Sequence, residues 1–272
     1  MKSFTKTTNQ SEDEMMFNQD RTIAERTVLT IAAVFGSILL FFGVQIIVSV
    51  IVVLVLSAFG NNEASVNDLI SSNNAVQFAF SLIVAAFLIS AIFIFLKMVK
   101  RKPWRFLKLN KRPRFKQFME VLLIYGLYFL TLIIASAIVS NATSVDVSQE
   151  QDLGAIATEG WGLLLTFLSL VVLAPIVEEI FFRGFLYRIT KSLAGRVVGY
   201  IIVSLLFGAA HLEFENLNYI AAIDTLIFSV FLIYVYERHN SLYSSIFLHA
   251  TKNAIAFTAL FLAPLYLQTM MG

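Results

Sequence analysis

The sequence predicts an all-α fold, a polytopic transmembrane helical bundle, and three observations support this fold class. Hydrophobic residues make up 58% of the 272-residue chain and charged residues 14%, with a mean hydropathy of +0.79. Soluble domains carry about 25% charged residues. Seven apolar windows approach the length that crosses a bilayer core of about 30 Å. Most charged residues lie between these windows, and the sign of the charge alternates along the chain.

The seven windows are the predicted membrane spans, with an eighth left open. The first is long enough to be tilted or to end in an interfacial turn, whereas the fifth, at 15 residues, is short. The predicted spans are 30–58, 75–96, 118–140, 161–182, 197–211, 219–236 and 242–267.

Lysine and arginine are concentrated in three stretches, and three other hydrophilic loops contain neither. The basic stretches are residues 2–26, 97–116 and 183–196, and the loops without Lys or Arg are 60–74, 141–160 and 212–218. Because cytoplasmic loops are enriched in Lys and Arg, this alternation predicts basic loops inside and a cytoplasmic N-terminus. We expect an integral membrane protein of the plasma membrane.

Residues 97–116 carry ten positive charges and no negative one. Each can gain about 1 kcal/mol near an anionic leaflet, so anionic lipids are the expected partners of this segment. Trp104, Phe106 and Leu107 are the expected apolar anchors of an interfacial helix that begins at Pro103. Nucleic-acid binding is the alternative for such a basic run, and we predict no nucleic-acid partner.

Two adjacent glutamates, Glu178 and Glu179, end an apolar run, where a carboxylate costs about 2.5–3.5 kcal/mol on insertion scales. On a helix Glu179 and Arg183 are i and i+4 with the acid first, the favourable order for an ion pair. We therefore expect Glu179 and Arg183 to form a structural clamp and Glu178 to act as a general base. Pro175 is expected to kink this helix.

Two of the three histidines also lie in apolar spans. Phe207 and His211 share a helix face, and the i, i+4 pair His249 and Asn253 directs two hydrogen-bond donors the same way, as an oxyanion site requires. Singly, each motif is explained as well by interhelical hydrogen bonds. Counting helix rise places His211 about 7 Å deeper than the other site residues, so we expect a tilt or a bend at Gly208.

Asp224 and Lys252 lie near mid-membrane depth in the last two predicted spans. Opposite charges at this depth are costly unless they are paired or hydrated. We therefore expect them to pair between the two spans or to line a water-filled site.

Several protease designs are excluded by the residues that the chain lacks. The chain contains no cysteine, so there is neither a thiolate nucleophile nor a disulfide. No Gly-x-Ser-x-Gly elbow occurs. Asp224 is the sole aspartate inside a predicted span, so an aspartyl dyad is missing.

Three motifs in this order resemble those of one known family. Glu-Glu-x-x-x-Arg at 178–183, Phe-x-x-x-His at 207–211 and His-x-x-x-Asn at 249–253 are similar to the motifs of the CPBP intramembrane proteases. This family, also called Abi, comprises CAAX proteases and bacteriocin-processing enzymes and includes the eukaryotic type II CAAX prenyl endopeptidase. The resemblance covers roughly residues 120–267.

The resemblance implies an intramembrane endopeptidase that acts on a peptide or membrane-protein substrate, in peptide maturation, bacteriocin immunity or signalling. It also implies roles for the site residues. Glu178 with His211 would activate a water, His249 with Asn253 would stabilise the oxyanion, and Arg183 would position the acid pair that Glu178 forms with Glu179.

No cofactor is expected, because the zinc motif His-Glu-x-x-His is absent. If a divalent metal such as zinc were bound, its ligands would be Glu178, His211 and His249. The Glu178 end of its helix is expected to face the cytoplasm.

We divide the chain into a polar cytoplasmic tail (1–26), two N-terminal spans with the basic cytoplasmic loop (27–117), and a CPBP-like catalytic membrane domain (118–272). The alternative to a protease is a non-proteolytic scaffold or immunity protein with the same fold. A proton-coupled transporter is a third candidate, but no inverted repeat is found.

Overall fold

The computed structural model describes residues 21–58, 69, 73–142, 160–212 and 219–271. The secondary-structure elements in these ranges are all helices, which confirms the all-α polytopic bundle. The predicted tail up to residue 20 and most of the three loops without Lys or Arg lie outside the described residues. The elements are α2 (Ile23–Ala58), α4 (Asn74–Met98), α5 (Pro103–Phe106), α6 (Phe115–Ala142), α7 (Gly160–Phe167), η1 (Leu168–Leu173), α8 (Ala174–Glu179), η2 (Ile180–Tyr187), α9 (Arg188–Ala194), α10 (Arg196–Ala209), α11 (Tyr219–His239), α12 (Leu242–Phe257), η3 (Thr258–Leu262) and α13 (Ala263–Met271).

Six of the described helical segments are long and apolar enough to cross a membrane. They are Ile23–Ala58, Asn74–Met98, Phe115–Ile138, Gly160–Ala194, Ile220–His239 and Leu242–Leu267. The predicted span at 197–211 corresponds to α10, whose 14 residues extend about 21 Å, less than a bilayer core of about 30 Å. The seven predicted spans thus become six long helices in the described residues, with α10 as a shorter helix packed against α11.

The helix with the acid pair runs without a break from Gly160 to Ala194 and contains two π-helical segments. η1 and η2 are π-helical, and α8 lies between them. Pro175, which lacks an N–H and clashes with the carbonyl of a regular α-helical turn, is the second residue after η1. The wider π-helical turns therefore stand where the sequence predicts a kink. π-helical turns are rare in proteins, and those that occur often lie at functional sites.

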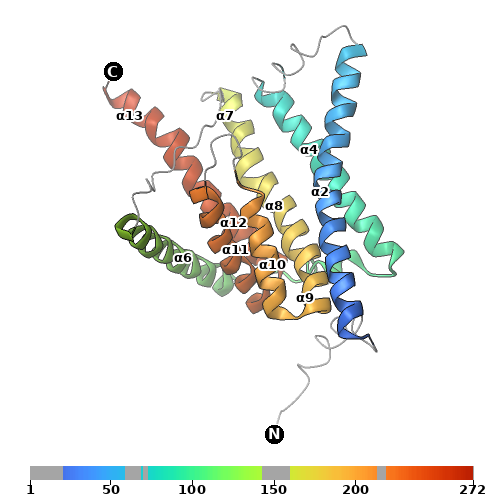
Figure 1. The fold of residues 1–272 in the computed structure, drawn as a ribbon. Coiled ribbons are helices and arrows are strands. Elements are labelled where there is room, and N and C mark those ends of the chain that lie inside the picture. The colour runs from blue at the N-terminus through green and yellow to red at the C-terminus, as the bar shows by residue number, and fades with distance from the viewer. Residues whose placement is uncertain (1–20, 59–68, 70–72, 143–159, 213–218, 272) are drawn as a thin grey trace.

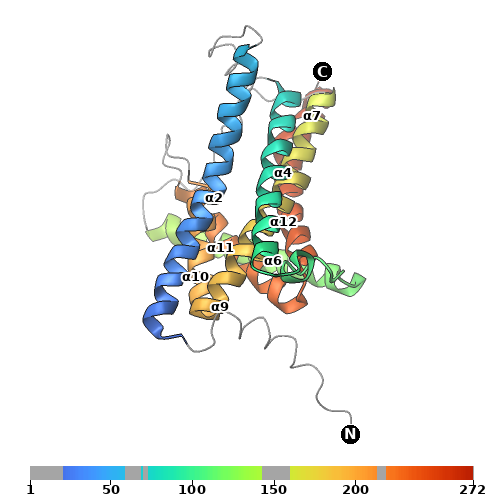
Figure 2. The same ribbon diagram turned by 90° about the vertical axis from the view of Figure 1, so that its right-hand side faces the viewer.

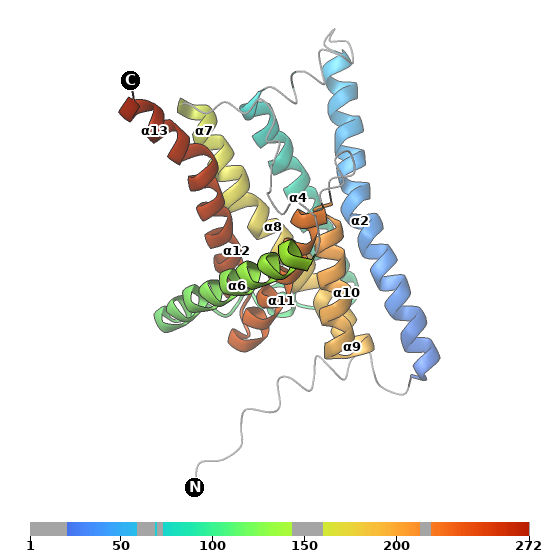
Figure 3. The same ribbon diagram turned by 60° about the vertical axis from the view of Figure 1, so that its left-hand side comes forward.

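The long helices do not contribute equally to the protein interior. Figure 1 shows α2 along one side of the bundle and α6 on the opposite side, strongly inclined to the other helices, and the turned views of Figures 2 and 3 agree. Only three residues of α2 are buried, Thr30, Ser37 and Val48, whereas every residue of η2 is buried. The interior therefore centres on the η2 segment and the helices that surround it.

The basic segment differs from its prediction in one respect. A short helix, α5, begins at Pro103 as expected, and Trp104 is 60% exposed. Phe106 and Leu107, however, are buried in the core, where Leu107 packs on Gly184. The expectation that these two residues anchor the chain in the membrane is therefore wrong, because Gly184 in η2 leaves space for Leu107 inside the protein.

The basic stretch at 183–196, which was expected to be a loop, is almost entirely helical. Residues up to Ala194 are helical, and only Gly195, with φ +89°, separates α9 from α10. Glu237 of α11 forms ion pairs with Lys191 at 2.6 Å and with Arg196 at 2.6 Å. It also accepts a hydrogen bond from the Tyr187 hydroxyl at 2.7 Å. These cations thus join the ends of three helices.

Candidate functional site

The two glutamates on α8 have different partners, as the i, i+4 spacing predicts. Arg183 Nη1 donates to Glu179 Oε1 at 2.7 Å, and both side chains are fully buried. Arg183 Nη2 donates to Ser229 of α11 at 2.8 Å, and its guanidinium lies 4.1 Å from the centre of the Phe207 ring. The Glu179–Arg183 clamp is therefore present, and it ties η2 to α10 and α11.

Glu178 faces both histidines of the predicted site. Its Oε2 lies 3.9 Å from His211 Nε2 and 3.8 Å from His249 Nε2, distances too long for direct hydrogen bonds. This oxygen is buried and has no hydrogen-bond partner within the described part of the chain. The three motifs, which are far apart in the sequence, thus converge on one carboxylate oxygen.

His211 lies in the turn that follows α10 rather than on the helix itself. Its Nδ1 is 2.8 Å from the carbonyl oxygen of Phe207, and the two rings pack with centres 4.7 Å apart. One turn earlier, Gly208 allows close contact with α11, because a Cβ there would lie 2.7 Å from the Ala222 carbonyl oxygen. The expectation that His211 continues the helix face of Phe207 is corrected, although the two side chains do meet.

His249 connects the two glutamates. Its Nδ1 lies 3.0 Å from Glu179 Oε1, while its Nε2 faces Glu178. The ring packs between Phe207 and Phe228, with ring centres 5.8 and 5.7 Å away. His249 is 4% exposed, so its orientation is fixed by packing on both faces and by one carboxylate.

The hydrogen-bond partners determine which nitrogen of each imidazole carries a proton. A carbonyl oxygen can only accept, so His211 Nδ1 donates to Phe207. Ionised Glu179 can likewise only accept from His249 Nδ1. When the two rings are neutral, each therefore directs an unprotonated Nε2 toward Glu178, and three acceptor atoms meet at one place.

Asn253 is placed differently from its predicted pairing with His249. Its Nδ2 donates to the carbonyl oxygen of Leu170 in η1 at 2.7 Å. The amide thus contacts the helix that carries Glu178, in the segment that precedes the acid pair.

Asp224 and Lys252 form the predicted pair, with Lys252 Nζ 2.7 Å from Asp224 Oδ2. Tyr128 of α6 also donates its hydroxyl to Asp224. Sequence reasoning missed Tyr128 and Ser229, both of which hold charged residues of this region. A hydroxyl group inside an apolar span was the available signal, but many such groups bond to their own helix, as Thr131 does.

The acceptors around Glu178 are of the kinds that zinc binds, two imidazole nitrogens and a carboxylate oxygen. They are spaced 3.8 and 3.9 Å from the carboxylate oxygen, wider than the distance of about 3.4 Å between two ligands of a tetrahedral zinc. Across the described ranges no group of three or more His, Cys, Asp or Glu side chains is placed to hold a metal ion. As they are placed, these residues do not fit a metal.

Residues 160–255 match the protein-family model described as "Type II CAAX prenyl endopeptidase Rce1-like". The matched segment, 96 of the 272 residues, is similar to this family. It contains all three motifs, and the match confirms the resemblance inferred from the sequence. No curated protein and no solved structure matches the chain. The family is one of proteases, which supports an intramembrane CAAX-type endopeptidase in general.

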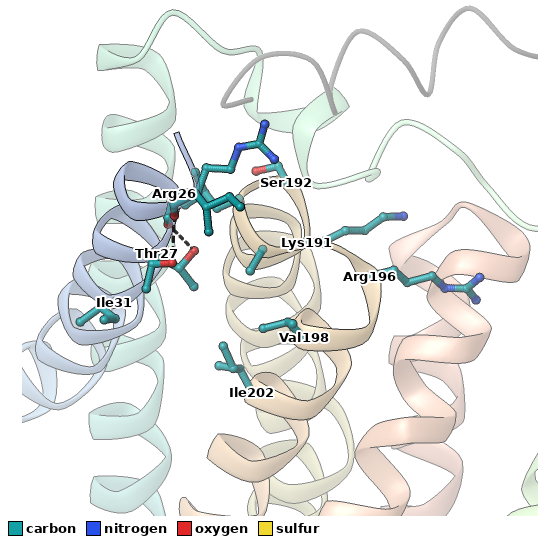
Figure 4. Close-up of a pocket in the computed structure, with 13 residues that line it drawn as sticks. Arg26, Thr27, Ile31, Lys191, Ser192, Arg196, Val198 and Ile202 are labelled. Carbon is teal, nitrogen blue, oxygen red and sulfur yellow. Dashed lines mark hydrogen bonds between the residues drawn. The ribbon is translucent and has the colours of Figure 1, made fainter. Parts of the chain in front are cut away.

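A separate hollow of about 940 Å³ lies between the start of α2 and the α9–α10 junction (Figure 4). Arg26 and Ser192 lie near one another at one end, and Val198 and Ile202 line the other end. None of the predicted site residues lines this hollow. The Glu178 cluster, rather than this space, is therefore the candidate active site.

Proposed function

We propose that this protein is an intramembrane endopeptidase in which Glu178 acts as general base on a water molecule. The observation that carries the proposal is the convergence of Glu178 Oε2 with His211 Nε2 at 3.9 Å and His249 Nε2 at 3.8 Å inside an apolar bundle. Polar atoms separated by more than 3.5 Å are commonly bridged by water. A water at this place can donate one hydrogen to Glu178 and the other to His211.

His249 is the candidate donor to an oxyanion, because its Nε2 faces Glu178 while its Nδ1 contacts Glu179. A ring that carries protons on both nitrogens presents an Nε2–H at this place. Such a donor is worth about 2.7–4 kcal/mol in other proteases.

These positions support the following reaction. The water oxygen attacks the peptide carbonyl carbon while Glu178 takes its proton, and the oxyanion of the tetrahedral intermediate accepts a hydrogen bond from His249. Glu178 then returns the proton to the leaving nitrogen as the carbon–nitrogen bond breaks. Ser229 holds Arg183, Arg183 holds Glu179, and Glu179 holds His249.

The biological setting is part of the same proposal. Substrates are peptides or membrane proteins, and the process is peptide maturation, bacteriocin immunity or signalling. We place the protein in the plasma membrane with a cytoplasmic N-terminus and with anionic lipids at residues 97–116. Ten positive charges without an acid in that segment support the lipid contact.

A reconstituted cleavage assay with Glu178→Gln tests the proposal. Loss of the general base should lower kcat by about 10²–10⁴-fold, whereas Glu120→Gln, which changes an acid paired with Arg238 away from the site, should leave kcat within about twofold of wild type. A chelator arm tests whether a metal on Glu178, His211 and His249 is needed, and we expect cleavage to survive it. A Glu178→Gln protein that keeps its cellular phenotype would identify a non-proteolytic scaffold.

A further inference from the structure

The hydrogen bond from Asn253 to Leu170 has a specific origin in the backbone of η1. In this π-helical segment the N–H of Ala174 donates to the carbonyl of Ser169, five residues earlier. The next donor in that register would be the N–H of residue 175, and its acceptor would be the carbonyl of Leu170. Residue 175 is a proline and has no N–H.

The carbonyl that Pro175 leaves without a backbone donor is therefore the one that Asn253 reaches. In an apolar environment an unsatisfied backbone group costs several kcal/mol, and neighbouring helices supply side chains where a proline frees a carbonyl. Asn253 comes from α12, which packs against both η1 and α8. One side-chain bond thus replaces one backbone bond and joins two helices.

We infer that Asn253 is a positioning residue, which holds η1 and α8, and with them Glu178, in register with His249 on α12. The inference rests on the proposed function, because it assigns Asn253 a role in that reaction. Glu178 is three residues after Pro175, and His249 is one turn before Asn253. On α12 the bond at 2.7 Å lies about one helical turn from His249. On the other helix its acceptor lies about two turns before Glu178, so the bond ties together the two sides of the 3.8 Å gap between Glu178 and His249.

A double-mutant cycle of Asn253→Ala and Pro175→Ala tests this role. In the wild-type background Asn253→Ala should lower kcat per folded enzyme by about 10²-fold, the effect of a misplacement of about 1 Å. In the Pro175→Ala background, where residue 175 regains its N–H, the same change should alter kcat by less than about twofold. An equal loss in both backgrounds would show that Asn253 acts directly on the substrate, and would overturn the inference.

The melting temperature of the detergent-solubilised protein gives a second cycle that needs no cleavage activity. Asn253→Ala should lower it in the wild type and not in Pro175→Ala. Thr251→Ala, which removes a hydroxyl bonded within α12 to Phe247, is the matched control and should have the same effect in both backgrounds. If Asn253→Ala lowers the melting temperature equally in both backgrounds, the inference is overturned even in an active protease. If Asn253→Ala lowers it only in the wild-type background and no cleavage is found, only the proposed function is contradicted.

Two further outcomes keep the role of Asn253 testable. If Pro175→Ala does not fold, Asn253→Asp is tested instead. A carboxylate cannot donate to the Leu170 carbonyl, so Asn253→Asp should lower kcat more than Asn253→Ala does. Equal effects of Asp and Ala contradict the inference. Coupled melting temperatures with unchanged kcat per folded Asn253→Ala enzyme also contradict it, since the bond would then support the fold without positioning Glu178.

Discussion

The helices α2 and α11 show how differently a membrane protein uses apolar and polar residues. α2 is the most apolar of the six long helices, and 6% of its most apolar 18-residue window is buried inside the protein. The window of α11 is less apolar, and 44% of it is buried. Lipid solvates apolar side chains as well as the protein interior does, so a very apolar helix gains little from burial. Polar side chains, in contrast, require protein partners.

The same contrast appears in what each helix buries. α2 buries two hydroxyl residues, Thr30 and Ser37, whose hydroxyls bond within their own helix. α11 buries Asp224 and Ser229, which bond to other helices. The comparison predicts that changes near the polar residues of η2 and α11 affect stability far more than changes on α2.

The largest effect is expected for Arg183→Met in η2. The change leaves Glu179 without its buried cation and Ser229 without its donor, so the free energy of unfolding should fall by about 3–5 kcal/mol. Unfolding of the protein in detergent measures this. Leu39→Ala on α2, at a position 72% exposed, is the control and should change stability by about 0.5 kcal/mol or less. Similar losses in both variants would refute the comparison.

A slightly smaller loss is expected when the Asp224–Lys252 pair is broken. Lys252→Met should cost about 3 kcal/mol, the low end for a buried pair, because the lysine side chain is 19% exposed. The double variant Asp224→Asn with Lys252→Met contains no uncompensated charge and should recover most of that loss. Thermal unfolding of the four proteins provides the cycle, and a double variant as unstable as the sum of the singles would exclude a net pairing.

Two glycines give the next comparison. An added Cβ at Gly208 would lie 2.7 Å from the Ala222 carbonyl oxygen and 2.9 Å from Leu226 Cβ, whereas Gly43 of α2 has no atom within 4 Å. Gly208→Ala should therefore separate α10 from α11 and cost about 2 kcal/mol. Gly43→Ala should cause no loss, since alanine favours the helix. Equal melting temperatures for the two variants would contradict the close packing of α10 on α11.

A pH-dependent effect is expected at Lys108, whose Nζ lies 4.2 Å from the ring centre of Tyr236 at the end of α11. Burial, together with the charges of Arg188 and Lys191, lowers the pKa of Lys108 to about 7. An unfolded lysine keeps its proton up to about pH 10.4. Between about pH 7 and pH 10.4 the unfolded state thus binds more protons, so this group makes stability increase with pH.

Lys108→Met should remove that increase while leaving the other pH-dependent groups in place. Denaturant unfolding at about pH 6 and about pH 9.5 compares the two proteins. We expect the variant to gain the most relative to wild type at the lower pH, where the buried lysine is charged. An identical pH dependence in both proteins would mean that Lys108 is not buried as a cation.

The sequence predicted the helices better than it predicted their ends and neighbours. Long apolar runs specify membrane helices because each residue adds its own transfer free energy, and α4 is found within a few residues of its predicted limits. The i, i+4 spacing predicted the Glu179–Arg183 bond because both side chains belong to one helix. Phe106 and Leu107 were misplaced because an apolar residue at a helix end can face either lipid or protein.

The sequence by itself determined that this chain is a helical membrane protein, that Glu179 is neutralised by Arg183, and that three polar motifs are of the kind found in one protease family. The tertiary structure decided that His249 bonds to Glu179, that Asn253 bonds to Leu170, and that Glu178 faces both imidazoles. The reason is physical. Helix formation and membrane insertion depend on local groups, whereas the partner of a buried donor depends on how separate helices are rotated and shifted against each other.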